Sequence, residues 1–274
     1  MTELERRVAL LTARWELDVG ARFPATPGSY GNHVAPARLA DGTRCVLKVS
    51  SHIDETRSEI RALEIWNGRG AARLLAADAD LGGLLVERVE PGSMLVEEAT
   101  DAATHVAAGV LRELWRVDAT LAGLRSLESW SGAFDRNRQA LNRGLGGFPA
   151  GLFDRADRLR TELLASTTHP VVLHGDLHHF NVLRSERANW LAIDPKGLYG
   201  DRCFDVCQFL RNPESVPLGV NRRRLDMLCA ELELDPRRAR AWCLVHAVLD
   251  ACWCFEEQRA FAARVAYAEQ AALF

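Results

Sequence analysis

Three short apolar runs that border chemically capable polar residues constrain this chain more than any other feature. The runs are 171–174, 181–184 and 190–194. Their length, and the turn residues between them, predict a compact island of β-strands. Strands arranged in this way would bring Asp176, Asn181 and Asp194 to one edge of the island. The alternative is a turn rich in Asp, Asn and Gly that only caps local backbone groups.

The two halves of the chain differ in texture. The predicted elements of the first half are strands at 33–39, 43–50, 74–77 and 84–89 and a helix at 54–66. Asp41-Gly42 joins the first two strands and favours a two-residue hairpin turn. Glu90-Pro-Gly-Ser93 breaks the pattern, so we place the boundary between two lobes there, at 1–90 and 91–274.

The second half is predicted to be mainly helical. From Val106 to Leu124, apolar residues recur at three- and four-residue steps, which indicates one face of an amphipathic helix. Residues 153–164 repeat the pattern, and Asp235-Pro opens a long final helical region. The expected fold class is α+β, with a small β-rich N-terminal lobe and a larger, mainly helical C-terminal lobe.

Composition excludes several classes of partner and location. The formal net charge of −3 provides no global basic field for nucleic acid or anionic lipid. No apolar stretch approaches the roughly 20 residues that a membrane span needs. The first 17 residues carry charges among their apolar positions and predict an amphipathic helix rather than a secretory signal. Seven cysteines without framework spacing are typical of reduced thiols and predict a cytoplasmic protein.

Asp176, Asn181 and Asp194 carry the oxygen atoms that phosphoryl transfer requires. That reaction needs a carboxylate to orient and deprotonate an attacking hydroxyl, and oxygen ligands for the Mg²⁺ that bridges nucleotide phosphates. Asp176 and Asn181 keep the five-residue offset of the kinase loop H-R-D-x-x-x-x-N. We therefore predict that Asp176 is catalytic and that Asn181 and Asp194 bind metal.

Only two of the 34 basic residues are lysines, Lys48 and Lys196. Since a compact ammonium and a guanidinium fork are not interchangeable, these lysines are candidates for positions where an amine matters. Lys48 lies in an apolar run, as the lysine of V-A-I-K does in kinases, where a helix glutamate fixes it near nucleotide phosphates. Glu59 is the preferred partner, and Glu64 on the same helix is the alternative. Lys196 either approaches the transferred phosphate, holds the loop after Asp194 or lies on the surface.

Two further segments are candidates for nucleotide contact. Residues 27–33 form a glycine-containing turn whose backbone amides could cover phosphates, although an ordinary loop is the alternative. Residues 85–89 run into the boundary between the lobes, where an adenine would meet unpaired backbone groups. The candidate nucleotide-binding residues in these segments are Gly28, Ser29, Gly31, Glu87 and Val89.

The sequence resembles the aminoglycoside phosphotransferase-like kinases, and more narrowly the streptomycin 6-kinase and hydroxyurea kinase group. The matching segments are Trp66-Asn-Gly-Arg-Gly-Ala-Ala-Arg-Leu-Leu75, His174-Gly-Asp-Leu-His-His-Phe-Asn181 and Trp190-Leu-Ala-Ile-Asp-Pro-Lys-Gly197. The last two are highly specific, and the likeness extends over nearly the whole chain. The resemblance implies a bilobal protein-kinase-like fold, ATP with Mg²⁺, and phosphate transfer to a hydroxyl of a small molecule. On the matching positions it implies that Asp176 is catalytic, Asn181 and Asp194 bind metal, and Lys48 binds phosphate.

Departures from protein kinases indicate a small acceptor. Gly175 replaces the arginine that would receive an activation-loop phosphate, so we expect no switching by phosphorylation. Asp205 follows Asp194 by only eleven positions, which leaves no room for a peptide-docking segment. Asp205 is expected either to brace the loop around Asp176 through its backbone N–H groups or to cap a helix. His174 is expected to form hydrogen bonds within that loop.

The leading candidate acceptor is an aminoglycoside such as streptomycin. Asp250, Glu256 and Glu257 on the last long helix could face its cationic groups, with Trp253 as a wall, although a solvated helix face is the alternative. Hydroxyurea, choline, homoserine or a sugar amine are the other acceptors considered. A catalytically idle nucleotide-binding module is the alternative from another class. ATP and the acceptor are the only partners expected, and the sequence assigns no oligomeric state.

Overall fold

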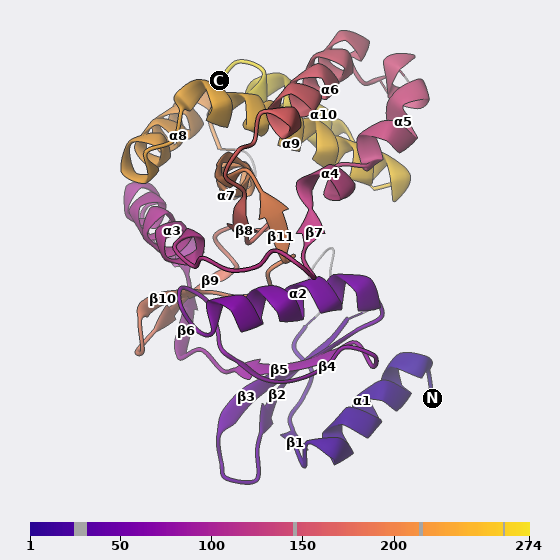
Figure 1. The fold of residues 1–274 in the computed structure, drawn as a ribbon, viewed down its shortest axis with the longest axis vertical. Helices are drawn as coiled ribbons and strands as arrows, with labels where there is room; N and C mark the ends of the chain where they lie inside the picture. The colour runs from indigo at the N-terminus through magenta and orange to yellow at the C-terminus, as the bar shows by residue number, and fades with distance from the viewer. Residues whose placement is uncertain (25–31, 145–146, 214–215, 260) are drawn as a thin grey trace.

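The N-terminal lobe is built on a five-stranded antiparallel sheet with the order β1-β2-β3-β5-β4 (Figure 1). The computed structural model describes residues 1–24, 32–144, 147–213, 216–259 and 261–274. The strands are β1 (Asp18–Val19), β2 (Asn32–Arg38), β3 (Arg44–Ser50), β4 (Leu74–Asp78) and β5 (Gly83–Glu87), and the helices are α1 (Glu3–Arg14) and α2 (Ile53–Trp66).

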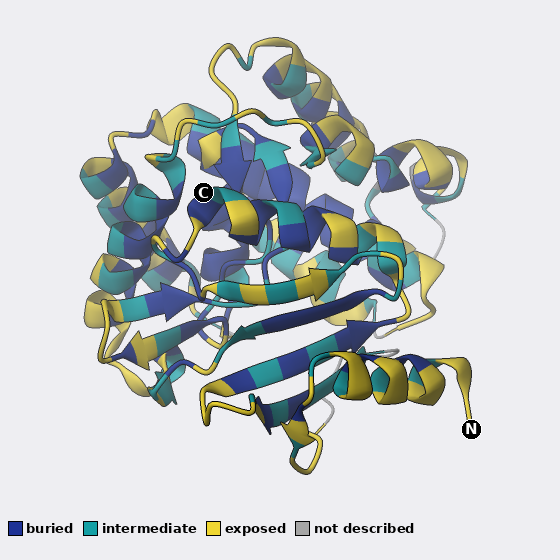
Figure 2. Ribbon diagram, turned by 60° about the horizontal axis from the view of Figure 1, so that its bottom comes forward, coloured by how far each residue is buried: buried dark blue, intermediate teal, exposed yellow. Residues whose placement is uncertain are grey.

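The two helices of this lobe cover opposite faces of the sheet. Successive side chains of a strand point to opposite faces, and β5 shows this directly. Leu85 packs with Leu11 of α1, whereas Leu84 belongs to the core that contains Leu63 of α2. The outer surface of α1 is largely exposed (Figure 2). Because Lys48 on β3 pairs with Leu84, it lies on the α2 side of the sheet.

The C-terminal lobe is mainly helical and carries two small three-stranded sheets, β10-β9-β6 and β7-β11-β8. Its strands are β6 (Pro91–Met94), β7 (Arg125–Ser126), β8 (Val171–Leu173), β9 (Val182–Ser185), β10 (Asn189–Ala192) and β11 (Leu198–Gly200). Its helices are α3 (Thr100–Trp115), α4 (Leu127–Trp130), α5 (Ala133–Asn142), α6 (Ala150–Ala165), α7 (Asp205–Arg211), α8 (Leu218–Leu232), α9 (Pro236–Glu256) and α10 (Ala262–Ala271). Helix α9 is buried on most of its surface because α5, α6, α7, α8 and α10 pack around it. None of the helices in the described ranges is both long and apolar enough to cross a bilayer.

Two local predictions need correction. The hairpin between β2 and β3 exists, but its turn is longer than two residues: Leu39 accepts from Gly42 N–H, and of the two predicted turn residues only Gly42 has a positive φ. Helix α3 begins at Thr100 and ends at Trp115, so Val117, Leu121 and Leu124 pack on the core without being helical. Gly123, with a φ of 87°, is incompatible with a helix there.

Residues 90–93, where we place the boundary between the lobes, include a short strand. Pro91 to Met94 form strand β6, which pairs with β9 at the start of the C-terminal lobe. The Glu90 carbonyl also accepts from Glu186 N–H at 2.9 Å. The chain therefore enters the C-terminal lobe as a strand of the small sheet that leads to Asp194.

Candidate active site

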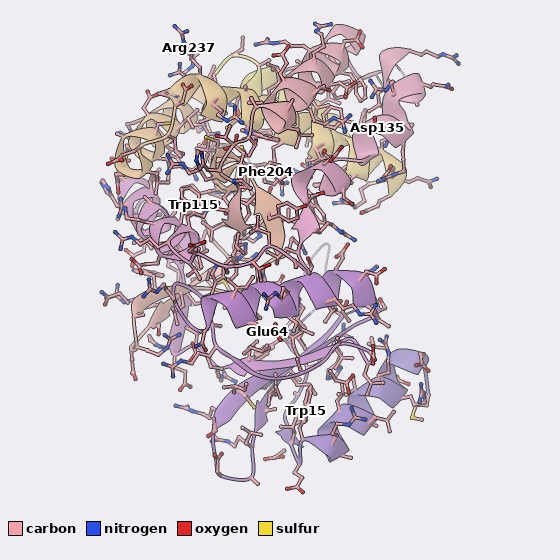
Figure 3. The ribbon with its side chains drawn as sticks, in the orientation of Figure 1. Trp15, Glu64, Trp115, Asp135, Phe204 and Arg237 are labelled. Carbon is pink, nitrogen blue, oxygen red and sulfur yellow. The ribbon has the colours of Figure 1, made fainter. Side chains whose placement is uncertain are left out.

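Lys48, Glu59 and Asp194 meet where the two lobes face each other. The Nζ atom of Lys48 lies 2.8 and 2.7 Å from the two carboxylate oxygens of Glu59 and also forms an ion pair with Asp194. Glu64 is exposed and pairs with Arg61 instead (Figure 3). The structure thus pairs Lys48 with Glu59 and not with Glu64.

The charges in this cluster support one another. Burial disfavours the charged form of Lys48, but the Asp194 and Glu59 carboxylates outweigh it and raise the pKa of the ammonium. Desolvation likewise opposes ionisation of Asp194, but Lys48 and Lys196 outweigh it and lower the pKa of that carboxyl. Burial raises the pKa of Glu59, and the charge of Lys48 partly opposes this increase. Asp194 is therefore an anion at neutral pH, paired with Lys48 and further stabilised by the charge of Lys196.

The loop that carries Asp194 is fixed to α2 at very close range. Ser58 on α2 donates its hydroxyl hydrogen to the Gly197 carbonyl at 2.6 Å and accepts from Arg125 N–H at 3.0 Å. A Cβ at Gly197 would stand 2.0 Å from the Ser58 carbonyl oxygen, and the φ of Gly197 is 63°. No side chain fits at Gly197, which explains the glycine at the end of the third matching segment.

Asp205 holds the loop that precedes Asp176. Its carboxylate accepts from the backbone N–H groups of His174 at 3.0 Å and Gly175 at 2.8 Å, and from Trp115 Nε1 at 3.1 Å. Burial raises the pKa of Asp205 to about 6, while these donors favour the ionised form. Asp205 braces the loop, as one of the two sequence expectations had it.

His174 forms the hydrogen bonds expected within the loop. Its Nδ1 faces Asp176 N–H at 3.2 Å, and its Nε2 faces the Ile193 carbonyl at 3.0 Å, so a neutral ring satisfies both contacts. Burial lowers the pKa of His174 to about 3. Trp66 stacks on the ring, with 6.4 Å between centroids. His174 thereby joins the Asp176 loop to the residue that precedes Asp194.

Asp176 is positioned by side chains that sequence reasoning had not singled out. Gln208 Nε2 donates to Asp176 Oδ1 at 2.6 Å. Arg211 Nε donates to Gln208 Oε1 at 3.0 Å, which fixes the amide so that its nitrogen faces Asp176. Gln208 and Arg211 lie three and six residues after Asp205, on the same helix α7. Helical spacing from Asp205 is the signal that could have found Gln208.

His179 and Arg224 form a buried support behind the loop. His179 stacks on Phe209 at 4.1 Å between centroids, and the Arg224 guanidinium lies 4.5 Å from the same ring. Arg224 Nη2 donates to the carbonyls of Phe209 at 2.7 Å and Asn212 at 2.8 Å. Burial lowers the pKa of Arg224 to about 10 and that of His179 to about 3. Arg224, on α8, was not expected from the sequence.

Asn181 and Asp194 suit a hard divalent cation. Asn181 Nδ2 donates to the Asp176 carbonyl at 3.0 Å, which leaves the amide oxygen free of that contact. Ile193 N–H donates to the Asn181 carbonyl at 2.9 Å, so Asn181 and the residue before Asp194 are adjacent. An amide oxygen and an ionised carboxylate are ligands that Mg²⁺ accepts. The donor set therefore fits the metal that the resemblance implies.

The remaining nucleotide candidates are placed differently. Gly28, Ser29 and Gly31 lie outside the described residues. The Glu87 carboxylate forms an ion pair with Arg187 at 2.5 Å. Val89 is buried beside Ala72 and Leu191. The structure thus brings the Glu87 side chain to an interlobe contact.

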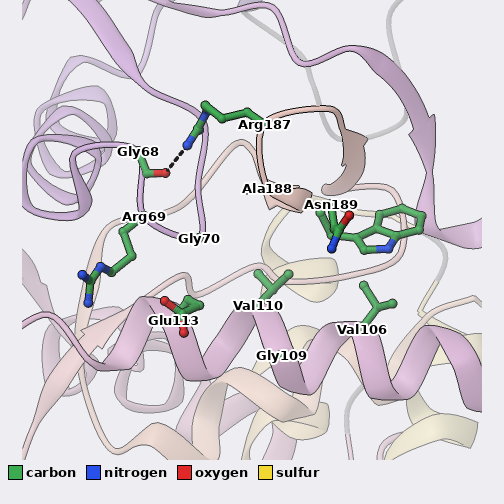
Figure 4. Close-up of a pocket in the computed structure, with 11 residues that line it drawn as sticks. Gly68, Arg69, Gly70, Val106, Gly109, Val110, Glu113, Arg187, Ala188 and Asn189 are labelled. Carbon is green, nitrogen blue, oxygen red and sulfur yellow. Dashed lines mark hydrogen bonds between the residues drawn. The ribbon is translucent and has the colours of Figure 1, made fainter.

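Arg187 joins the two lobes at the first matching segment. Its guanidinium donates to the Gly68 carbonyl at 2.8 Å (Figure 4) and to the Ala71 carbonyl at 3.2 Å. Ala72 N–H donates to the Ala192 carbonyl at 2.9 Å, two residues before Asp194. A cavity of about 550 Å³ lies beside this junction. Its lining residues are Gly68, Arg69, Gly70, Val106, Gly109, Val110, Glu113, Arg187, Ala188, Asn189 and Trp190.

The acceptor candidates on α9 are already paired. Asp250 forms ion pairs with Arg211 at 3.3 Å and Arg264 at 3.0 Å. The other pairs are Glu256 with Arg136 at 2.8 Å and Glu257 with Arg259 at 2.5 Å. Trp253 packs edge-on against Trp130 at 5.2 Å between centroids. A second cavity of about 370 Å³ has Arg211 and Arg264 in its wall. The structure does not bring these carboxylates together as one open anionic surface.

Comparisons with known proteins agree with this architecture. The chain is 36% identical over 261 residues to streptomycin 6-kinase of Streptomyces glaucescens, covering 90% of this chain and 81% of the relative. It is 38% identical over 267 residues to hydroxyurea phosphotransferase of Kitasatospora aureofaciens, covering 93% and 74%.

Solved structures confirm the fold. Choline kinase LicA from Streptococcus pneumoniae superposes with a TM-score of 0.70 at 14% identity over the whole of both chains, and LicA has also been solved with AMP. At that identity the likeness establishes the bilobal protein-kinase-like fold alone. The model of the aminoglycoside/hydroxyurea antibiotic resistance kinases matches residues 14–258. The chain therefore belongs to the aminoglycoside/hydroxyurea antibiotic-resistance kinase family and is a phosphotransferase.

Proposed function

We propose that the protein transfers the γ-phosphoryl group of ATP, with Mg²⁺, to a hydroxyl of a small polar acceptor, with streptomycin as the leading candidate. The observation that carries this proposal is the ion pair that Lys48 of the N-terminal lobe forms with Asp194 of the C-terminal lobe. It sets the amine against Asp194, and Ile193, the residue before Asp194, contacts His174 of the Asp176 loop. The relatives named streptomycin 6-kinase and hydroxyurea phosphotransferase support the reaction class.

Asp176 orients the acceptor hydroxyl and takes its proton. Gln208 donates to one carboxylate oxygen, so the other, Oδ2, is the atom available to the hydroxyl. The Asp205 carboxylate and the His174 ring keep the backbone of this loop in place, and the neutral ring adds no charge next to Asp176. A carboxylate fixed in this way is pre-oriented for general-base catalysis.

Lys48 holds the nucleotide phosphates, and its hydrogen bonds to Glu59 fix the position of its ammonium. Asn181 and Asp194 would hold Mg²⁺, which when bound neutralises charge on the phosphate oxygens. Glu59 is buried and takes no part in the chemical step, so its role is to position the Lys48 amine. Lys48 and Asp194 come from different lobes, so the site depends on how the lobes are held.

Hydroxyurea is the second candidate acceptor, and one observation favours it. The carboxylates of Asp250 and Glu256 on α9, and of Glu257 just after it, were expected to meet a cationic acceptor, and each has an arginine partner. A neutral acceptor does not need unpaired carboxylates, whereas guanidinium and ammonium groups do.

A panel of acceptors tests the proposal. ADP release is measured with streptomycin, hydroxyurea, choline, homoserine and a sugar amine, and the phosphorylated product is located by mass spectrometry. We expect turnover with streptomycin or hydroxyurea. Binding of ATP without transfer to any of them would instead indicate an idle nucleotide-binding module and overturn the proposal.

A further inference from the structure

Lys196 stands beside Asp176 although the two residues are 20 positions apart. Its backbone N–H donates to the His174 carbonyl at 2.8 Å, which fixes the loop after Asp194 against the Asp176 loop. Its Nζ atom lies 4.0 Å from Asp176 Oδ2, the oxygen that Gln208 does not occupy. The ammonium is therefore on the side of Asp176 where we place the acceptor hydroxyl.

The two lysines of the chain are held in different ways. Lys48 donates to both oxygens of Glu59 at hydrogen-bond distance, and its side chain is 13% exposed. Lys196 is 31% exposed, and its separation from Asp176 is beyond hydrogen-bond distance. Its ammonium thus keeps N–H donors available for a ligand, whereas Lys48 is largely engaged.

The charge on Lys196 needs no special surroundings. A lysine ammonium keeps its proton at neutral pH, so Lys196 acts as a fixed positive charge rather than as a proton donor.

We propose that Lys196 is a further catalytic residue, whose ammonium contacts the phosphoryl group during transfer and neutralises charge on its oxygens. This inference rests on the proposed function. The acceptor oxygen forms a bond to the γ-phosphorus, and the bond from that phosphorus to the β,γ-bridging oxygen breaks. The electron pair leaves with ADP, and the acceptor proton passes to Asp176. Lys196 gains and loses no proton, so it supplies electrostatic stabilisation alone.

The test compares Lys196→Gln, Lys196→Arg and Arg57→Gln with the wild type, using the acceptor that the panel identifies. Arg57 is an exposed basic residue paired with Asp54 and Asp80, and serves as the matched control. We expect Lys196→Gln to lower kcat about 100-fold to 1,000-fold, the range for removing one transition-state donor. The Kd of AMP-PNP and the Tm should stay close to wild type. Lys196→Arg should recover part of kcat, and Arg57→Gln should match the wild type.

Each outcome separates the inference from the proposed function. If the wild type transfers phosphate and Lys196→Gln keeps its kcat, Lys196 lies outside the chemistry and only the inference fails. If Lys196→Gln weakens AMP-PNP binding as much as it lowers kcat, the lysine binds ground-state nucleotide and the inference is again overturned. If Lys196→Gln does not fold, a wild-type kcat in Lys196→Arg with a lowered Tm would show a structural role. If the wild type phosphorylates no acceptor, both proposals fail.

Discussion

Two groups of carboxylates have different kinds of partner: those of the interlobe cluster around Lys48 and those on helix α9. In the interlobe cluster, Lys48 on β3 pairs with Glu59 on the following helix α2 and with Asp194 of the other lobe. On the α9 side, Asp250 and Glu256 are paired with arginines of the same lobe. A lysine can turn its three N–H donors toward an arriving phosphate, whereas an arginine fork holds a carboxylate in one geometry. The comparison teaches that an acidic residue near a site is not by itself an available ligand.

The largest expected effect comes from Asp176 itself. Asp176→Asn keeps the size of the side chain but removes the base, so kcat should fall about 1,000-fold or more, near the upper range for general-base catalysis. AMP-PNP affinity, measured by calorimetry, should change little. Asp80→Asn, an exposed aspartate of the other lobe, is the control. Retention of more than a tenth of kcat would move the catalytic base elsewhere.

Lys48 allows stability and nucleotide binding to be separated. Lys48→Met leaves Glu59 buried without its partner and should lower the free energy of unfolding by about 3 kcal/mol. Adding Glu59→Gln removes the unpaired charge and should restore much of that loss without restoring AMP-PNP affinity. Urea unfolding and nucleotide titration measure the two quantities. If the double variant regains affinity for AMP-PNP, Lys48 only supports the fold, and the interlobe cluster would resemble the ion pairs of α9.

Two buried histidines, one in the Asp176 loop and one on α9, predict the same pH dependence of stability. Burial lowers the pKa of His174 beside Asp176 and of His246 on α9 to about 3, from 6.5 for a free side chain. The folded state therefore binds fewer protons than the unfolded chain between these values. Each histidine's contribution to the free energy of unfolding is present above pH 6.5. It is lost as the pH drops toward 3, by up to about 1.4 kcal/mol per pH unit. His246→Leu should reduce the slope by one proton in urea unfolding between pH 4 and 6 (roughly the window between the two pKa values), and an unchanged slope would contradict this.

The smallest effect is expected on the α9 side. Glu256→Gln breaks an ion pair with Arg136 that is partly solvent-exposed, so stability should change by less than about 1 kcal/mol. The KM for streptomycin should stay within about threefold of wild type, and a threefold change corresponds to roughly 0.6 kcal/mol of binding free energy. Arg136→Gln should behave alike. A tenfold rise in KM for Glu256→Gln alone would show that the acceptor displaces the arginine.

The sequence predicts which residues of the interlobe cluster and the Asp176 loop lie together, because the information for this is local; their roles stay predictions. Lys48 in a strand, Asp176 and Asn181 five positions apart, and Asp194 after the next hairpin are each defined by spacing along one or two elements. Strand alternation and the helix period then bring them together. The choice of Glu59 over Glu64 followed from its central place in α2, and the structure confirms that pairing.

The partners of the α9 carboxylates could not be predicted in the same way. Asp250 meets Arg211 and Arg264 from two other helices, and no pattern within α9 reveals those partners. The same is true of Arg187, which reaches the carbonyl groups of Gly68 and Ala71 from more than 100 positions away. Helix α3 was misplaced because apolar spacing continues past Trp115 into a segment where Gly123 prevents a helix.

The scarcity of lysine has a practical consequence. Apart from the chain's own α-amino group, Lys48 and Lys196 are the only primary amines, and both lie next to carboxylates of the same site. An amine-selective reagent therefore has almost no background elsewhere on this molecule. Mapping the labelled peptides with and without nucleotide would report occupancy of each position separately, and with no acceptor needed.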